Sequence, residues 1–175
     1  QELPAMKHSR RFWKMLCILL AAAFVGLLLS IIICAVAVRT ATYTVTLQSL
    51  SSPLRLVAVS DLHGRSFGRD NSRLLEKIRA QKPDAILLVG DMIDRSAEES
   101  DAERLAALVG TLTDIAPAFF APGNHEQTYM KTDPTLLDRM AQAGATVVDD
   151  SYVDVTIAGQ PLRIGGTMGH GFAFG

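Results

Sequence analysis

Three clusters of polar side chains follow three short apolar runs in this sequence. The runs are typical of buried strands in a parallel sheet, whose carboxyl ends meet at one edge of the sheet, where ligands bind. We therefore expect the three clusters to surround one crevice. Their members are Asp61 and His63 in VSDLHG, Asp91, Asp94 and Arg95 in VGDMIDR, and Asn124, His125 and Glu126 in APGNHEQ.

The residue types in these clusters favour metal chemistry. Carboxylates gathered in one crevice repel one another unless cations are bound between them. A ligand set that mixes oxygen atoms with imidazole nitrogens suits Mn, Fe, Zn or similar ions. A carboxylate shared by two ions holds them about 3.5–4 Å apart, the arrangement used for phosphoester hydrolysis. The clusters therefore predict two divalent metal ions that activate a water molecule.

Each cluster taken alone has a simpler interpretation. Asp61 and Asp91 could be turn or cap residues, and Asn124 could cap a turn after Gly123. A shared site is favoured because all three clusters occupy the same topological position and together supply oxygen donors and imidazole.

The segments between the clusters predict an α/β domain with a parallel core. Tyr43, Val45 and Leu47 alternate with threonines and predict a strand over 40–48, followed by a turn-rich linker over 49–53. The other expected elements are strands at 54–60, 85–89 and 118–121, helices at 69–81, 97–112 and 133–143 with Pro134 in the first turn, and short strands in TVV, YVDVTIAG and PLRIGG with turns at 149–150 and 159–160.

The motif set, in this order and with helix-length gaps, resembles the calcineurin-like metallophosphoesterase superfamily. The resemblance covers about 54–126 and implies hydrolysis of phosphoester bonds, chiefly phosphodiesters, on an α/β/β/α sandwich of two mixed sheets flanked by helices. With the N-terminal apolar segment and the segment 40–48, the sequence also resembles the membrane-associated, YaeI/YkuE-like phosphodiesterase branch.

The resemblance implies roles for the metal ligands. Asp61 and His63 would bind the first ion, Asp91 would bridge both ions, and Asn124 would bind the second.

The resemblance also implies roles around the substrate. His125 would be the acid or the imidazole that orients the substrate, and Asp94 would hold it. Arg95 and Glu126 would have supporting roles.

The later histidines of the family pattern are not matched. One histidine should follow a later strand, and two should come from a Gly-His-x-His motif. The four histidines here are His8, His63, His125 and His170, and Phe172 stands where the second histidine of that motif would be. We therefore expect His170 to be a loop residue rather than a ligand, and the domain over 41–175 to be the N-terminal half of the sandwich. Half a sandwich exposes apolar strand faces and open edges, so we expect this chain alone to be poorly stable, to bind two metals weakly and to be inactive.

An apolar segment over 16–38 precedes the domain and contains no charged residue. It is long enough to cross the hydrocarbon core of a membrane as a helix. Residues 1–14 are basic, so the positive-inside rule predicts a cytoplasmic N-terminus, a single-pass anchor over 15–38 and an extracytoplasmic domain. The alternative is a cleaved signal peptide, because Ala35-Val36-Ala37 resembles a cleavage site, but signal h-regions usually span about 7–15 residues.

The composition of the chain bears on which binding partners are expected. The formal net charge is −1 and the two cysteines lie in the apolar segment, so the sequence predicts neither a nucleic-acid footprint nor disulfides in the domain. No protein partner is predicted, and a lipid-linked phosphoester is favoured as substrate by the anchor and the resemblance alone. The competing hypothesis is a noncatalytic, membrane-anchored scaffold or binding domain. A Rossmann-like nucleotide binder is disfavoured because the first strand lacks a glycine-rich loop after it.

Overall fold

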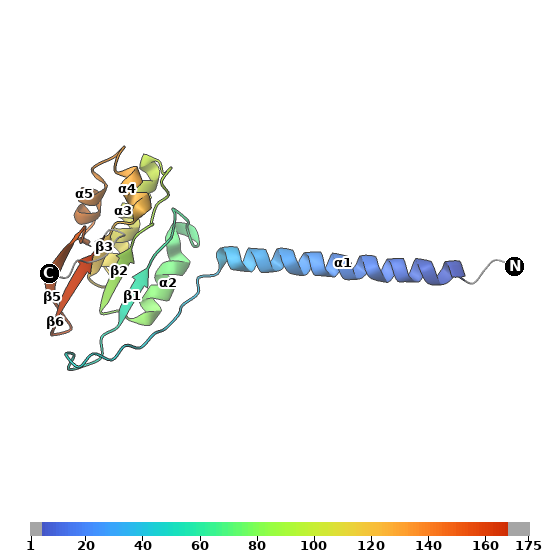
Figure 1. Cartoon of the computed structure of the whole chain (residues 1–175), viewed down its shortest axis with the longest axis horizontal. Helices are drawn as coiled ribbons and strands as arrows, with labels where there is room; N and C mark the ends of the chain where they lie inside the picture. The colour runs from blue at the N-terminus through green and yellow to red at the C-terminus, as the bar shows by residue number, and fades with distance from the viewer. Residues whose placement is uncertain (1–4, 168–175) are drawn as a thin grey trace. The chain divides into compact units, whose positions relative to one another are not determined.

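A computed structural model describes residues 5–167 of the chain, which divides into two compact units, residues 1–39 and residues 40–175 (Figure 1). His170 lies outside the described residues.

The first unit is one long helix, α1 (Ala5–Val36). Its stretch Arg10–Ile31 has a mean hydropathy of 2.4 and is not buried. At 1.5 Å per residue these 22 residues extend over about 33 Å, enough to cross a membrane. A signal sequence near an N-terminus would have the same length and composition, so the structure is compatible with both interpretations of this helix.

The second unit is built on a four-stranded parallel sheet in the order β1-β2-β3-β4. The apolar runs form its strands as predicted, which confirms an α/β fold with a parallel core. The strands are β1 (Leu56–Val59), β2 (Ala85–Val89), β3 (Ala118–Ala121) and β4 (Thr146–Val147).

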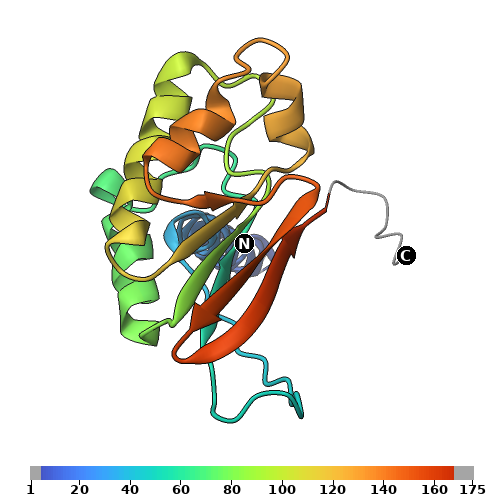
Figure 2. The same ribbon diagram turned by 90° about the vertical axis from the view of Figure 1, so that its left-hand side faces the viewer.

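Helices connect these strands and cover one face of the sheet (Figure 2). Leu74, Leu75 and Ile78 recur at helical spacing and are buried, so the burial of one apolar stripe fixes α2 against the sheet. The connecting elements are the 3₁₀ turn η1 (Arg69–Asn71), α2 (Ser72–Gln81), α3 (Glu99–Thr113), α4 (Asn124–Tyr129) and α5 (Leu136–Gln142).

An antiparallel hairpin, β5 (Ser151–Ile157) and β6 (Gln160–Gly166), lies against the other face of the sheet (Figure 2). Ala85, Phe119 and Ile157 form the buried centre of this contact. Between the helices and the hairpin, Phe120 in β3 is fully buried, which stabilises the domain by about 3 kcal/mol relative to exposure. The short strands predicted in TVV, YVDVTIAG and PLRIGG are confirmed as β4, β5 and β6.

Three local predictions are wrong. The structure has no strand over 40–48, and there the side chains of Tyr43 and Val45 are 86% and 76% exposed. Alternation gives a strand one apolar face, but its backbone N–H and C=O groups also need a neighbouring strand. No described strand pairs with this segment. The hairpin turn occupies Ala158 and Gly159, one residue earlier than predicted, and both have positive φ, as a type I′ turn requires.

The third wrong prediction concerns the start of α5. The helix begins at Leu136 instead of residue 133, so Pro134 precedes it. The Asp133 carboxylate accepts hydrogen bonds from the N–H and hydroxyl of Thr135 at 3.0 and 2.6 Å, which closes a turn ahead of the helix.

The linker before β1 is attached to the hairpin through one buried side chain. Gln160 is 4% exposed, and its Oε1 accepts the N–H groups of Ser51 and Ser52 at 2.8 and 3.2 Å. Its amide nitrogen donates to the Ser52 carbonyl at 2.9 Å. This amide therefore fixes the chain entering β1 beside the hairpin turn.

Candidate metal centre

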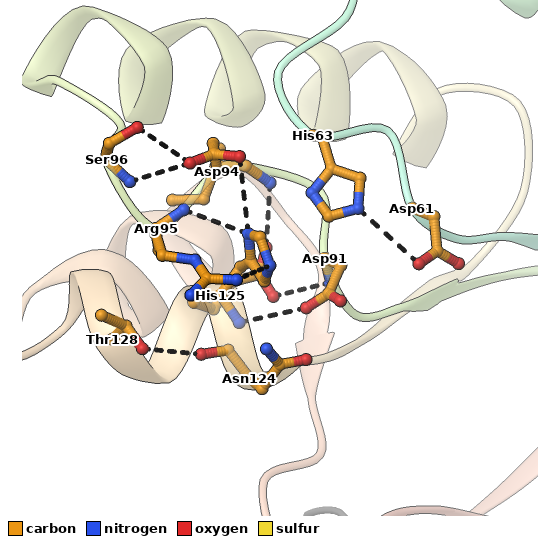
Figure 3. Close-up of polar contacts among 11 residues, drawn as sticks. Asp61, His63, Asp91, Asp94, Arg95, Ser96, Asn124, His125 and Thr128 are labelled. Atoms are coloured by element: carbon orange, nitrogen blue, oxygen red, sulfur yellow. Dashed lines mark hydrogen bonds and ion pairs between the residues drawn. The ribbon is translucent and has the colours of Figure 1, made fainter.

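The three predicted clusters meet at the carboxyl edge of the parallel sheet (Figure 3). The first two lie in the loops that directly follow β1 and β2, and the third forms the first turn of α4, just after β3, so the parallel strand order itself brings them together. The rest of the geometry comes from hydrogen bonds between the loops.

Backbone hydrogen bonds join the loop after β1 to the loop after β2. The N–H groups of Asp61, His63 and Gly64 donate to the carbonyls of Gly90, Asp91 and Met92 at 3.2, 2.9 and 2.8 Å. The sheet thus continues as a set of loop contacts beyond the ends of its strands.

Asp61, His63 and Asp91 have left-handed backbone conformations, with φ of 57°, 48° and 55°. For a residue with a Cβ, this conformation costs about 1–2 kcal/mol. The loop-to-loop hydrogen bonds hold the three residues in it, and backbone strain of this kind clusters at functional sites.

The loops after β2 and β3 approach each other closely because two glycines face one another. A Cβ built on Gly90, which has φ +69°, would lie 2.8 Å from the Cα of Gly123. The backbone N–H of His125 can therefore donate to Asp91 Oδ1 at 3.1 Å.

Ligand atoms of Asp61, His63 and Asp91 lie within 4.8 Å of one another. His63 Nε2 is 3.8 Å from Asp61 Oδ1, and His63 Nδ1 is buried without a hydrogen-bond partner among the described residues. Two carboxylates beside one imidazole, with its Nε2 facing Asp61, fit a divalent cation, because such an ion would bring these groups together and balance their charge.

His63 also belongs to a second group of potential ligands. Potential ligand atoms of His63, Asp94 and His125 lie within 4.8 Å of one another. The two imidazole rings meet edge to face, with centroids 4.5 Å apart. The ring of His63 is therefore close both to the other predicted metal ligands, Asp61 and Asp91, and to the predicted catalytic pair, Asp94 and His125.

His125 is the more buried member of the predicted catalytic pair, at 9% exposure. Its Nδ1 is 3.7 Å from Asp94 Oδ2 and accepts the Arg95 backbone N–H at 3.1 Å, while its Nε2 is 3.4 Å from the Arg95 guanidinium. A neutral imidazole has a single bare nitrogen, so only one ring nitrogen can accept from Arg95. We assign that role to Nδ1, whose contact is shorter, which leaves the ring proton on Nε2.

Asp94 is held by Ser96, a residue that the sequence analysis did not single out. The backbone N–H of Ser96 and then its hydroxyl donate to Asp94 Oδ1 at 3.0 and 2.8 Å, and with weaker attraction from His125 and His63 they lower the pKa of the Asp94 carboxyl. The signal was available, since Asp-x-Ser is a local turn pattern.

Asn124 is the exposed first residue of α4, and its carbonyl accepts the Thr128 hydroxyl at 3.0 Å. In Figure 3 the Asn124 side-chain amide lies near Asp91. The structure brings Asn124 to the same sheet edge as the other clusters, and its role as a ligand of a second ion stays a prediction.

A further carboxylate, outside the three clusters, lies at this sheet edge. Asp149 follows β4, and its Oδ1 is buried without a hydrogen-bond partner among the described residues. The sequence predicts a turn at 149–150 rather than a ligand, because β4 is only two residues long and its apolar run gives a weak signal.

Comparisons with known proteins agree on one family. A family model described as calcineurin-like phosphoesterase matches residues 54–167, which is more than half of the chain. An uncharacterized metallophosphoesterase of Campylobacter jejuni is 29% identical over 84 residues, covering 47% of this chain and 22% of that protein. A protein of Caenorhabditis elegans, also named as a metallophosphoesterase, is 31% identical over 122 residues, covering 68% of this chain and 24% of that protein.

The chain therefore spans less than a quarter of the length of these curated relatives. Among solved structures, the crystal structure of TT1561 of Thermus thermophilus is 21% identical, with a TM-score of 0.43 over 67% of this chain and 50% of that one.

Proposed function

The chain belongs to the calcineurin-like phosphoesterase family, and on that premise we propose that it forms part of a metal-dependent hydrolase that cleaves phosphoester bonds, with phosphodiesters as its substrates. The observation that carries this proposal is the placement of Asp61, His63 and Asp91 within 4.8 Å of one another, beside the Asp94–His125 pair. We further propose that residues 41–175 form the N-terminal half of an α/β/β/α sandwich.

Four residues of this chain would hold the metal ions. Asp61 and His63 would bind one ion, Asn124 the other, and Asp91 would lie between them as the shared carboxylate. Two divalent ions, Mn, Fe, Zn or similar, would lower the pKa of a water molecule and offset the charge that develops on the phosphoryl oxygens.

His125 would supply the proton for the leaving group. The donor would be the protonated imidazolium form, in which Nδ1–H would face Asp94 and Nε2–H would be the proton passed to the leaving group, which leaves a neutral imidazole. Asp94, kept ionised by Ser96, stands 3.7 Å from the same ring and would stabilise the orientation of the imidazole. The Arg95 guanidinium, 3.4 Å from His125 Nε2, would support the same ring.

We propose a membrane location for this activity. The apolar segment 16–38 and the basic residues before it support α1 as an uncleaved anchor, with the N-terminus cytoplasmic and the phosphoesterase domain on the other side. A domain tethered in this way would meet lipid-linked phosphodiesters, as in the YaeI/YkuE-like branch of the family.

Metal removal tests the proposed function. The full-length natural protein that contains this sequence would be stripped with EDTA and assayed with bis-p-nitrophenyl phosphate, with p-nitrophenyl phosphate as the monoester control. We expect diester turnover to disappear and to return with Mn²⁺, Fe²⁺ or Zn²⁺. Turnover that survives complete metal removal would contradict the proposal, and metal binding without turnover of either ester would favour a noncatalytic scaffold.

A further inference from the structure

Glu126 is a completely buried carboxylate that has no part in the chemistry described above. It is 0% exposed and is the third residue of α4, directly after the His125 of the catalytic pair. Buried carboxylates are costly unless their oxygens accept hydrogen bonds, so the partners of this one are informative.

Three backbone N–H groups donate to Glu126. Its Oε2 accepts from Asp91 and from Gly123, each at 2.7 Å, and its Oε1 accepts from Ile93 at 2.9 Å. Two of these donors lie in the loop after β2 and one in the loop after β3. One side chain therefore connects the two loops that carry the shared carboxylate and the proposed ligand of the second ion.

The contacts between these loops are reciprocal. Glu126 accepts the N–H of Asp91, while the Asp91 carboxylate accepts the N–H of His125 at 3.1 Å. The Asp91 carbonyl in turn accepts the N–H of His63 at 2.9 Å. Asp91 is thus held at its amide, carbonyl and carboxylate, in the left-handed conformation that it would otherwise avoid.

The negative charge of Glu126 suits this role better than a neutral side chain. A glutamine of the same shape keeps one acceptor oxygen but directs an NH₂ group at either Ile93 or the Asp91 and Gly123 pair, so donors would face donors. Hydrogen bonds to a charged acceptor are also shorter and stronger than neutral ones.

We propose that Glu126 is the positioning residue of the metal pair: it fixes the Asp91 backbone relative to the loop of Asn124, and so sets where the shared carboxylate meets the two ions. This inference rests on the proposed function, because it assumes that Asp91 bridges two ions. It gives Glu126 no contact with substrate or metal.

The test compares Glu126→Gln and Glu126→Asp with the unaltered full-length protein, using Asp133→Asn as a matched acid-to-amide control. Asp133 also accepts a backbone N–H, that of Thr135, but lies outside the strand-end loops. Mn²⁺ binding would be followed by titration, the ion pair by the exchange-coupled electron paramagnetic resonance signal, and folding by thermal melting.

We expect Glu126→Gln to remain cooperatively folded, to bind the second Mn²⁺ about 10- to 100-fold more weakly, and to lose the coupled signal, as outer-shell substitutions do. Glu126→Asp should keep part of the affinity, and Asp133→Asn should keep all of it. In metal-free protein, the amides of Asp91 and Gly123 should exchange with solvent faster in Glu126→Gln.

Two outcomes would overturn the inference and leave the proposed function standing. Wild-type Mn²⁺ affinity and an unchanged coupled signal in Glu126→Gln would refute it alone. If that variant does not fold, unchanged Mn²⁺ binding and unchanged amide exchange in Glu126→Asp would refute it in the same way. An unaltered protein that binds no metal pair would instead overturn the proposed function, and the inference with it.

Discussion

The backbone of Asp61, His63 and Asp91 lies in the left-handed region, at a cost of about 1–2 kcal/mol for each residue. Neighbouring loops offset this cost with hydrogen bonds to the same residues. These hydrogen bonds restrict the backbone of the proposed ligands, which reduces the reorganisation that metal binding would require.

At this scale the sequence predicts identities better than conformations. The types and spacing of Asp61, His63 and Asp91 indicate metal ligands, and the structure brings these three together. Their positive φ values could not be predicted, because Asp and His adopt left-handed backbone only in a minority of positions and here the contacts between loops select it. The three hydrogen-bond donors to Glu126 could not be predicted either, because they depend on how two segments far apart in the sequence meet.

The proposed role of His125 predicts a dependence on the leaving group. Replacing His125 by Ala removes the Nε2 proton, so turnover of an alkyl phosphodiester should fall about 10²–10⁴-fold. Turnover of a p-nitrophenyl diester should fall much less, because nitrophenolate leaves without a proton. Steady-state kinetics of the two esters, with metal content verified in each preparation, provide the measurement. Equal losses for both esters would show that His125 orients the substrate instead of donating the proton.

At the scale of the elements, close approach of the loops after β2 and β3 depends on Gly90 and Gly123. Strand order alone would bring the loops to the same edge, but a side chain at either glycine would separate them. The short helix α4 begins at this contact. It was not predicted because its six residues are mostly polar and offer no apolar stripe for a periodicity to reveal.

A pair of glycine substitutions tests this packing. A Cβ at Gly123 would lie 2.6 Å from the Asp91 amide nitrogen and overlap its carboxylate, so Gly123→Ala should lower stability by about 1–3 kcal/mol and weaken metal binding. Gly110 lies within α3, and in Gly110→Ala the new Cβ would lie 3.8 Å from the Ala143 carbonyl oxygen, an ordinary contact, so stability should rise by about 0.5–1 kcal/mol. Urea unfolding measures both, and a neutral Gly123→Ala would contradict the close approach.

At the scale of the whole molecule, the chain consists of an apolar helix and an α/β domain. The domain could be predicted in outline because buried parallel strands leave near-continuous apolar runs. The strand predicted over 40–48 is absent because a strand needs a hydrogen-bonded neighbour, and alternation within one segment does not show whether such a neighbour exists. The structure of α1 does not distinguish an anchor from a signal sequence, because both are apolar helices.

Two measurements separate these interpretations of α1. If α1 is an uncleaved anchor, the intact mass of the mature protein should include residues 16–38, and the protein should resist alkaline carbonate extraction. Leu28→Arg places a charge in the apolar stretch at a cost of about 2.5–3.5 kcal/mol and should reduce membrane retention, whereas Leu28→Ala should not. A mature N-terminus just after residue 37 would identify a signal peptide instead.

The central claim is that Asp91 is shared by two ions in a phosphodiester-cleaving site. The most direct measurement is the number of metal ions per molecule of the full-length protein, together with turnover of bis-p-nitrophenyl phosphate, before and after Asp91→Asn. Loss of the bridging charge should leave at most one tightly bound ion and abolish turnover. Two tightly bound ions and unchanged turnover in Asp91→Asn would contradict the account.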